Sequence, residues 1–541
     1  MRLLRGILGK ALTGLFTVAA AVFLIGLWQL KMLPGTYFAL LCIGLALLAG
    51  VLGVLIWSGH GLLRTSIGLP LAVVLLAALI VGNVYLWQTV NTLDNVTNSD
   101  TEIVHMGIYM RKDDTRSFDD TSAATYRYGI LHDIDREATD GALTQLNEKL
   151  KTQVSYQEFL SFSGLVDALL DGEVDAIILN QAILPIFEEL PGYSEKLEKI
   201  REVVLHEVEV PIETEPTTPT KNTDPSVTTR PDPTVTETPS ASTTPGNTEN
   251  TEMTENTVST EGTANTQQPT TPPAQKIKPF VVCISGLDNQ GTVSTRSCSD
   301  VNILAVVNPE TKQVLLVSTP RDYFIPLSNS KGMPDKLTHA GLYGVNVTKD
   351  SLAMLYDVEI DYYFKVNFNG FKKVIDALGG ITVYSEKSFT GRSHKVTYTF
   401  QQGLNELNGA EALAFCRIRD AFATGDRQRG KNQMAVIKAV IEKMMSRTLL
   451  TNYTSILNAV ESSVVMSIPK ELIGSLVSQQ LSEGGSWNVV TYSVNGSDDW
   501  AVPYTMRYEN FKTYVMRPNQ NHVNYAKVLI QDVLNGKVVK P

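Results

Sequence analysis

Cysteine is scarce in this sequence and positive charge is not in excess, and each shortage excludes a class of protein. Only 4 cysteines occur among 541 residues, which is too few for a small scaffold held together by disulfides. The formal net charge is −10 at pH 7, whereas a protein that coats nucleic acid needs excess positive charge to neutralise phosphates. We therefore expect no nucleic-acid partner, and the length predicts more than one domain.

Charged residues are absent from three long apolar stretches near the N-terminus, which cover residues 11–30, 37–57 and 69–87. Each is close to the roughly 20 residues that a helix needs to cross a bilayer. The first stretch is not followed by the small-residue cleavage site of a secretory signal. We therefore predict a short cytoplasmic tail over residues 1–10 and three transmembrane helices within residues 11–89.

Basic residues in the short flanking segments predict the orientation of these helices. Arg2, Arg5 and Lys10 precede the first helix and Arg64 separates the second from the third, whereas the other loop contains only Lys31. Lysine and arginine favour the cytoplasmic side of a membrane. We therefore expect a cytoplasmic N-terminus at the plasma membrane and, after three crossings, an extracellular location for the bulk of the chain.

Residues 102–207 carry the apolar spacing of short strands and helices, which predicts a small extracellular α/β accessory domain. Within it, residues 165–179 have the pattern of a helix, a turn and a buried strand. This pattern weakly resembles the unit that lines the ligand cleft of periplasmic solute-binding proteins. An ordinary packing unit without a ligand has the same pattern, so both interpretations stay open.

Residues 211–277 are rich in threonine and proline and contain almost no large apolar side chains. Such a segment cannot bury enough surface to offset the entropy lost on ordering, so we predict a disordered linker. As a tether, it would let the next domain work at a distance from the membrane or fold back to it. Residues 278–536 again alternate strands with helices, which predicts an α/β domain with a central mixed β-sheet flanked by helices. We expect a membrane-anchored, multi-domain protein.

The densest basic cluster lies within residues 412–433 and consists of Arg417, Arg419, Arg427, Arg429 and Lys431. The first two alternate like residues on one face of a strand, and the others open an expected helix. Arginines held on rigid elements suit phosphate, because a guanidinium group donates two parallel hydrogen bonds to its oxygens. On the helix, Gln433 shares a face with Arg429 and Asp426 lies in the first turn, so this helix end can point at an anion.

Further short motifs are spread in order over residues 278–536. They are 284–288 (ISGLD), 297–302 (SCSDVN), 318–322 (STPRD), 336–340 (KLTHA) and 376–380 (DALGG), and the basic cluster follows them. Together these motifs resemble those of the LytR-CpsA-Psr family of wall-polymer transferases. The resemblance implies a membrane-anchored phosphotransferase that moves a phosphate-linked anionic glycopolymer, of the teichoic acid or capsular polysaccharide type, from a polyprenyl diphosphate carrier to peptidoglycan.

The resemblance also implies roles for individual arginines. Arg321, Arg417, Arg419 and Arg429 would hold the diphosphate, and Gln433 would orient a phosphate oxygen or the metal shell. Preorganised arginines neutralise the charge of a phosphoryl-transfer transition state, which agrees with this assignment. Two alternatives remain open: a non-catalytic receptor or regulator that binds polyprenyl lipids, and a polyprenyl-diphosphate pyrophosphatase that uses water as the acceptor.

Carboxylates in the same motifs match the metal ligands of the family. Asp288 lies at the carboxyl end of one expected strand and Asp300 just before the next, so both could reach one Mg²⁺ or Mn²⁺, an ion that suits few carboxylates plus phosphate oxygens. Lys336 and Asp322 are placed by motif near the same site, where they could bind substrate or form a structural ion pair.

The general base is a separate question. His339 has a reference pKa near neutrality, but the family has histidine here beside the site rather than in it, so we favour a structural hydrogen bond for it. Asp426 or Asp300 could accept the proton of an acceptor sugar instead.

Two cysteines depart from the family pattern. Cys298 stands where the family commonly has an arginine, and Arg296 could replace that arginine only if the loop shifts. Cys416 stands where a small apolar residue is more usual. Because both are expected at the rim of one site, Cys298 and Cys416 form a candidate disulfide, with two separate thiols as the alternative.

Overall fold

The computed structural model describes residues 2–57, 62–97, 101–212, 276–287, 293, 295–393, 395–419, 421–422, 426–445, 453–461, 463–509 and 511–540. The segment 211–277, which the sequence predicts to be a disordered linker, lies almost wholly outside these residues. The prediction for it therefore stays a prediction.

Three long apolar helices occupy the N-terminal part of the chain: α1 (Arg2–Leu30), α2 (Gly35–Trp57) and α3 (Leu62–Thr97). Their spanning segments Ile7–Leu30, Gly35–Ile56 and Ile67–Thr97 have mean hydropathies of 2.1, 2.8 and 2.5. The prediction of three helices fit to anchor the chain in a membrane is confirmed. Asn83, a polar residue inside α3, donates from its amide to the Ala19 carbonyl oxygen at 3.1 Å and so joins α3 to α1.

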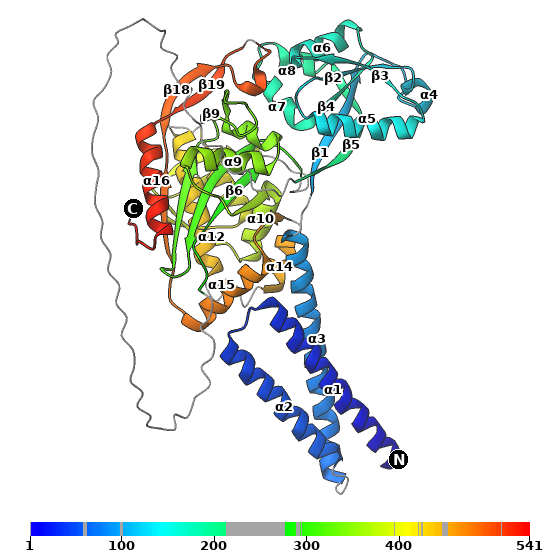
Figure 1. Cartoon of the computed structure of the whole chain (residues 1–541), viewed down its shortest axis with the longest axis vertical. Helices are drawn as coiled ribbons and strands as arrows, with labels where there is room; N and C mark the ends of the chain where they lie inside the picture. The colour runs from blue at the N-terminus through cyan, green and yellow to red at the C-terminus, as the bar shows by residue number, and fades with distance from the viewer. Residues whose placement is uncertain are drawn as a thin grey trace, which may run out of the picture. The chain divides into compact units, whose positions relative to one another are not determined.

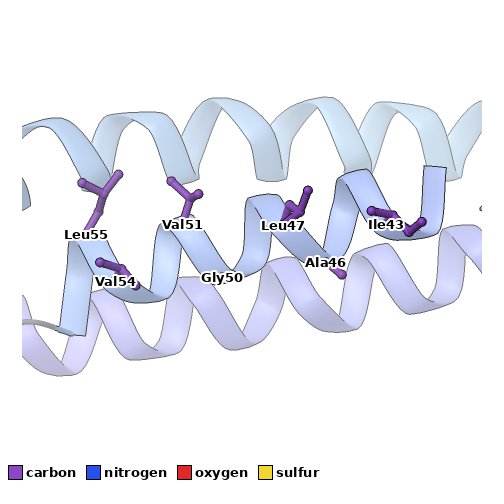
Figure 2. A pocket seen from close by; sticks show the side chains of 7 residues that line it. All are labelled: Ile43, Ala46, Leu47, Gly50, Val51, Val54 and Leu55. Carbon is purple, nitrogen blue, oxygen red and sulfur yellow. The ribbon is translucent and has the colours of Figure 1, made fainter. Parts of the chain in front are cut away.

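One side of α2 is hollowed and wholly apolar. Figure 2 shows the residues that line it, which are Ile43, Ala46, Leu47, Gly50, Val51, Val54 and Leu55. Such a surface on a membrane helix suits contact with lipid chains, and it carries no polar group that could recognise a specific ligand.

The accessory domain is built on a five-stranded sheet in the order β3-β2-β4-β1-β5. Its strands are β1 (Thr101–Arg111), β2 (Arg127–Leu131), β3 (Ser155–Phe159), β4 (Ala176–Asn180) and β5 (Ile200–Pro211). Its helices are α4 (Asp120–Ala123), α5 (Arg136–Leu150), α6 (Phe162–Asp171), α7 (Leu184–Phe187) and α8 (Tyr193–Leu197). β2, β3 and β4 are parallel, and β1 is antiparallel to β4 and β5.

Helix α6 shows how sequence sets the local structure of this domain. The Ser161 side chain caps its first turn by accepting from the Gly164 N–H at 3.0 Å, and Gly172 ends it in the left-handed conformation at φ 81°. Serine and glycine are favoured at these two positions for these reasons. The helix, the turn and the buried strand β4 occupy residues 162–180, where the sequence predicts them.

The C-terminal domain has a six-stranded mixed sheet in the order β16-β11-β6-β7-β8-β17. The strands are β6 (Phe280–Leu287), β7 (Ser299–Asn308), β8 (Gln313–Thr319), β11 (Tyr362–Asn367), β16 (Val464–Met466) and β17 (Asn488–Ser493). Alternate residues of the central strands pack in two separate apolar clusters, one with each layer of helices. Figure 1 shows helices on both sides of the sheet. One layer contains α9 (Val345–Tyr356) and α16 (Gln520–Leu534), and the other contains α12 (Asp426–Met444) and α15 (Lys470–Glu483). The predicted mixed sheet flanked by helices is confirmed.

Smaller elements complete this domain. Its short strand pairs are β9 (Phe324–Pro326) with β10 (Pro334–Lys336), β12 (Ile381–Ser385) with β15 (Gly403–Leu407), β13 (Phe389–Ser393) with β14 (Val396–Phe400), and β18 (Gly496–Ala501) with β19 (Thr513–Pro518). Within the described residues, the remaining helices are α10 (Phe368–Ala377), α11 (Gly409–Arg417), α14 (Tyr453–Glu461) and the 3-10 turns η2 (Leu337–Leu342) and η3 (Tyr504–Met506).

The C-terminal domain contacts the end of helix α3 directly. The Lys470 ammonium lies 2.5 Å from a carboxylate oxygen of Asp94, and the Asn95 amide donates to the Glu461 carboxylate at 2.9 Å. Val96 is buried between them in an apolar cluster with Val464. The domain is thus held at the membrane helices by side chains that lie outside the predicted linker.

Candidate active site

The candidate site lies at one edge of the six-stranded sheet. β6, β8, β11 and β17 run parallel, so their carboxyl ends meet at this edge together with the start of β7. Ligands of open α/β sheets bind at such edges. Asp300 stands at the start of β7 and Arg321 follows β8, so the structure brings these two predicted residues to this edge. Asp288 directly follows β6 but lies outside the described residues.

Arg321 is tied to two carboxylates at this edge. Its Nη1 atom donates to Asp300 Oδ1 at 2.8 Å, and its Nε atom lies 3.6 Å from Asp322 Oδ2. Arg321 and Asp300 are half-buried, whereas Asp322 is buried. The Asp300 strand is itself pinned, because the Ser299 hydroxyl bonds to the hydroxyl of Ser285 at 2.7 Å. The edge therefore presents a guanidinium group that is already oriented and still reaches solvent.

The segment before the basic cluster forms a helix rather than the strand that its alternating arginines predict. Helix α11 begins with a capping box in which the Asn408 side chain accepts from the Glu411 N–H at 3.0 Å, and it ends at Arg417. The strand prediction was wrong, because this capping box starts a helix whose last turn reaches Arg417, and the alternation covers only two arginines. The Arg417 guanidinium carbon lies 4.4 Å from the ring centroid of Phe368, which follows the carboxyl end of β11. Arg419 lies in the exposed segment after the helix.

Helix α12 starts at Asp426, as the sequence predicts for a helix near this position. It carries Arg429 and Gln433, which are both half-buried and one turn apart. The first turns of α12 lie beside the end of β8, because a Cβ on Gly430 would be 3.8 Å from the hydroxyl of Ser318. Asn432 joins α12 to α11 through a 3.1 Å hydrogen bond to the Phe415 carbonyl. α11, α12 and the strand ends thus converge at one place.

Residues 241–523, more than half of the chain, match the model of the LytR_cpsA_psr family. The chain belongs to the LytR-CpsA-Psr family. Over 187 residues it is 37% identical to the polyisoprenyl-teichoic acid–peptidoglycan teichoic acid transferase TagU of Bacillus licheniformis. The aligned residues make up 34% of this chain and 59% of that protein. Over 190 residues it is 36% identical to TagU of Bacillus subtilis strain 168, with coverages of 35% and 60%. The chain therefore spans about three fifths of the length of these curated relatives. The crystal structure of B. subtilis TagV, at 28% identity and a TM-score of 0.41, covers 49% of this chain and 100% of its own.

The carboxylates available for a metal at the LytR-CpsA-Psr site are few. Within the part of the chain that the structure describes, no group of three His, Cys, Asp or Glu side chains could hold a metal ion. Asp300 nevertheless offers a half-buried oxygen donor at the edge, and Mg²⁺ can be held by one or two carboxylates together with substrate phosphates. The residue fits such an ion, although Arg321 is its present partner. A metal at this site stays a prediction.

Lys336 is engaged by the accessory domain. Its ammonium lies 2.6 Å from Oε2 of Glu189, which follows helix α7, and its side chain is only 3% exposed. The motif alone left substrate binding and a structural ion pair as equal interpretations for Lys336. Glu189 is the partner that a structural ion pair requires. His339 Nδ1 forms a 2.7 Å hydrogen bond with one carboxylate oxygen of the buried Asp335. The other carboxylate oxygen of Asp335 accepts from the Thr505 N–H. The bond with Asp335 is the structural hydrogen bond that we favour for His339.

The candidate disulfide between Cys298 and Cys416 is not formed in the structure, where both cysteines are free. Cys298 packs against an apolar cluster made largely of accessory-domain residues such as Phe162, whereas Cys416 is buried in a different cluster around α11 and α12. The prediction failed because sequence spacing gives no distance, and the two thiols belong to separate packing units. Burial raises the pKa of Cys416 far above its ordinary value. A buried thiol with a raised pKa is a poor nucleophile.

Sequence reasoning missed a buried charge cluster between the two extramembrane domains. Glu102 of β1 accepts from Arg296 Nε at 3.1 Å, and its other oxygen is bonded to the Lys365 ammonium. Burial by itself raises the pKa of Glu102, but Lys365 and Arg296 outweigh it and hold that pKa below the ordinary value. Arg296 is therefore used in this cluster rather than in place of the arginine that Cys298 replaces. No local signal reveals the cluster, because its members are separated by up to 263 residues.

Proposed function

We propose that this chain is a phosphotransferase that moves a phosphate-linked anionic glycopolymer from a polyprenyl diphosphate carrier to peptidoglycan. The proposal is supported by arginines from separate segments that lie at the same edge of the sheet, near the carboxyl ends of β8 and β11. Arg321 follows β8, Arg417 lies over the ring of Phe368 after β11, and Arg429 lies on α12 beside the end of β8. Such a set of guanidinium groups suits a diphosphate better than a single phosphate.

These residues would bind and neutralise the diphosphate while one phosphorus–oxygen bond is exchanged for another. The acceptor hydroxyl oxygen would attack the phosphorus that carries the polymer, the bond to the bridging oxygen would break, and polyprenyl phosphate would leave. Arg321, Arg417, Arg419 and Arg429 would stabilise the charge on the non-bridging oxygens. Gln433 would orient one of those oxygens, and the hydroxyl proton would pass to Asp300 or Asp426.

A divalent ion is part of the proposal. Mg²⁺ or Mn²⁺ would be held by Asp300 and Asp288 and would supply further neutralisation of the diphosphate when bound. Asp322, which lies beside Arg321, would orient that arginine for the substrate. Lys336 would contribute positive charge to the site only after it is released from Glu189.

The apolar layer under the site suits a lipid carrier. α12 and α15 cover the sheet with partly buried side chains such as Ile437, Ile441 and Leu476. α15 also meets the end of α1, where a Cβ on Gly474 would lie 1.9 Å from the Leu30 carbonyl oxygen. An isoprenoid chain could thus pass from the bilayer to the site along apolar surface. In this proposal the N-terminus is cytoplasmic and the C-terminal domain faces the cell wall.

The test uses the full chain in detergent or nanodiscs with a polyprenyl-diphosphate-linked sugar and Mg²⁺, and it measures released polyprenyl phosphate. We expect Arg417→Ala to lower the rate on the order of 100-fold. The matched control is Arg392→Ala, because Arg392 is an exposed arginine on β13, and it should leave the rate unchanged.

The same assay separates the competing functions. Product joined to added peptidoglycan fragments would support transfer, whereas release without such product would support a pyrophosphatase. No release from the wild type would favour a lipid receptor. Equal rates before and after removal of divalent ions with a chelator would eliminate the metal from the proposal.

A further inference from the structure

The hairpin β18–β19 leaves the sheet at the same edge as the candidate site. Two residues separate β17 from β18. β18 pairs with β19 so that Trp500 faces Tyr514 and Asp498 faces Met516. The hairpin is fastened to helix α12, because Arg427 Nη2 donates to the Gly496 carbonyl at 3.0 Å. The same helix α12 carries Arg429 of the proposed diphosphate clamp.

One face of this hairpin presents aromatic rings to solvent. Trp500 is 61% exposed, and its ring lies edge-on to that of Tyr514, with centroids 6.3 Å apart and planes at 82°. The other tryptophan of the C-terminal domain, Trp487, is partly buried and its indole N–H donates to Gln480. A large aromatic side chain left exposed and braced by a second ring marks a place where a ligand can be recognised.

Polar groups on the same face are already oriented. The Tyr514 hydroxyl donates to Asp498 Oδ1 at 2.9 Å, and alternation along β18 places Asp498 on the same side as Trp500. A carboxylate held beside aromatic rings accepts hydrogen bonds from sugar hydroxyl groups, while the C–H face of a sugar ring packs on indole. We define Trp500, Tyr514 and Asp498 as the aromatic platform.

The charges around the aromatic platform disfavour an anionic polymer. Asp498 is largely exposed, and the nearby cations are directed at carboxylates: Arg517 Nε lies 2.8 Å from Asp499, and Arg427 lies 4.0 Å from Asp498. A polymer of phosphodiesters would meet carboxylates here rather than a cluster of cations. An uncharged glycan with hydroxyl and acetamido groups fits better.

We propose that the aromatic platform is a subsite for the N-acetylhexosamine glycan of the acceptor. The inference rests on the proposed function, since it assigns the acceptor of that reaction to one side of the arginine clamp. A glycan seated on Trp500 lies along the hairpin that leads to α12. Helix α12 also carries Arg429, one of the arginines that would hold the diphosphate of the donor.

Binding is measured directly, without turnover. The full chain in nanodiscs is titrated with tetra-N-acetylchitotetraose, an uncharged glycan, by calorimetry. We expect Trp500→Ala to weaken binding about tenfold and Trp500→Tyr to restore most of it. The matched control is Tyr525→Ala, because Tyr525 is an exposed aromatic residue on α16, and it should bind the glycan as the wild type does.

A second measurement separates this inference from the proposed function. Trp500→Ala should join less polymer than the wild type to peptidoglycan fragments at low fragment concentration, and a higher fragment concentration should reduce this difference. A wild type that binds the glycan but releases no polyprenyl phosphate would refute the proposed activity and leave the subsite standing. Unchanged glycan binding by Trp500→Ala, no binding by the wild type, or tighter binding of a glycerol phosphate polymer at the platform would each overturn the subsite.

Discussion

The molecule contains two groups of basic residues that look alike in the sequence and differ in the structure. At the sheet edge, Arg321 and Arg417 keep part of their surface in solvent, and Arg419 is exposed. Between the domains, Lys336 and Lys365 are each only 3% exposed and are paired with carboxylates of the accessory domain. The first group can still meet an anion from outside, whereas the second is occupied by Glu189 and Glu102. Burial and partner, rather than residue type, separate a binding site from a structural interface.

The largest expected effect comes from breaking the buried group. Glu102→Ala leaves Lys365 and Arg296 buried without their carboxylate, which should lower the free energy of unfolding by about 3–5 kcal/mol. Thermal unfolding of the full chain in detergent checks this. Glu209→Ala, at an exposed position on β5, should cost less than about 0.5 kcal/mol. Equal midpoints for the two variants would contradict the interface.

Acid should remove part of the same contribution. The pKa of Glu102 is lower in the folded chain than its ordinary value of 4.5, so its contribution to stability is fully present above that value. It is lost as the pH falls through the folded pKa, because the protonated carboxyl no longer balances the two cations. We expect the unfolding midpoint of the wild type to fall more steeply on acidification than that of Glu102→Gln. Parallel pH profiles would show that Glu102 is not the titrating group.

A smaller effect is expected for the partly exposed pair of Glu189 and Lys336. A double-mutant cycle of alanine substitutions should give a coupling energy of about 1–2 kcal/mol, because the Lys336 ammonium is buried while Glu189 still meets solvent. The surface pair Lys431 and Glu386, 3.2 Å apart and both exposed, is the matched control. Its coupling should be near zero. If both pairs give the same coupling, Lys336 is not held by the accessory domain.

The smallest effect should come from reductant. Cys298 and Cys416 are free and belong to different apolar clusters. Dithiothreitol should therefore leave the unfolding midpoint and the transfer rate unchanged. If dithiothreitol lowers the unfolding midpoint of the wild type but not that of Cys298→Ser, the disulfide is present after all.

The sheet of the C-terminal domain could largely be predicted from the sequence, whereas the contacts between domains could not. Apolar runs predict strands within residues 280–285, 301–307 and 313–318, and these lie in β6, β7 and β8, because alternation records which side chains face each helix layer. Motif order identifies the site segments, since each motif is local. The sequence did not reveal that helix α11 continues to Arg417. Two alternating residues are too few to distinguish the repeat of a strand from that of a helix. The pair of Glu102 with Lys365 could not be found, because only the packed structure brings such distant residues together.

The residues at the two ends of the Thr/Pro-rich segment argue against the role of a long tether that its composition suggests. Ile212 packs on one face of the C-terminal domain and Ile277 on the other face of the same sheet. Lys470 and Asp94 already hold this domain at α3. The segment between Ile212 and Ile277 therefore connects two points of one folded unit. The entropy of closing a loop grows slowly, by about 0.6 kcal/mol for each doubling of its length. We therefore expect changes in the length of the segment to alter the stability of the C-terminal domain only slightly.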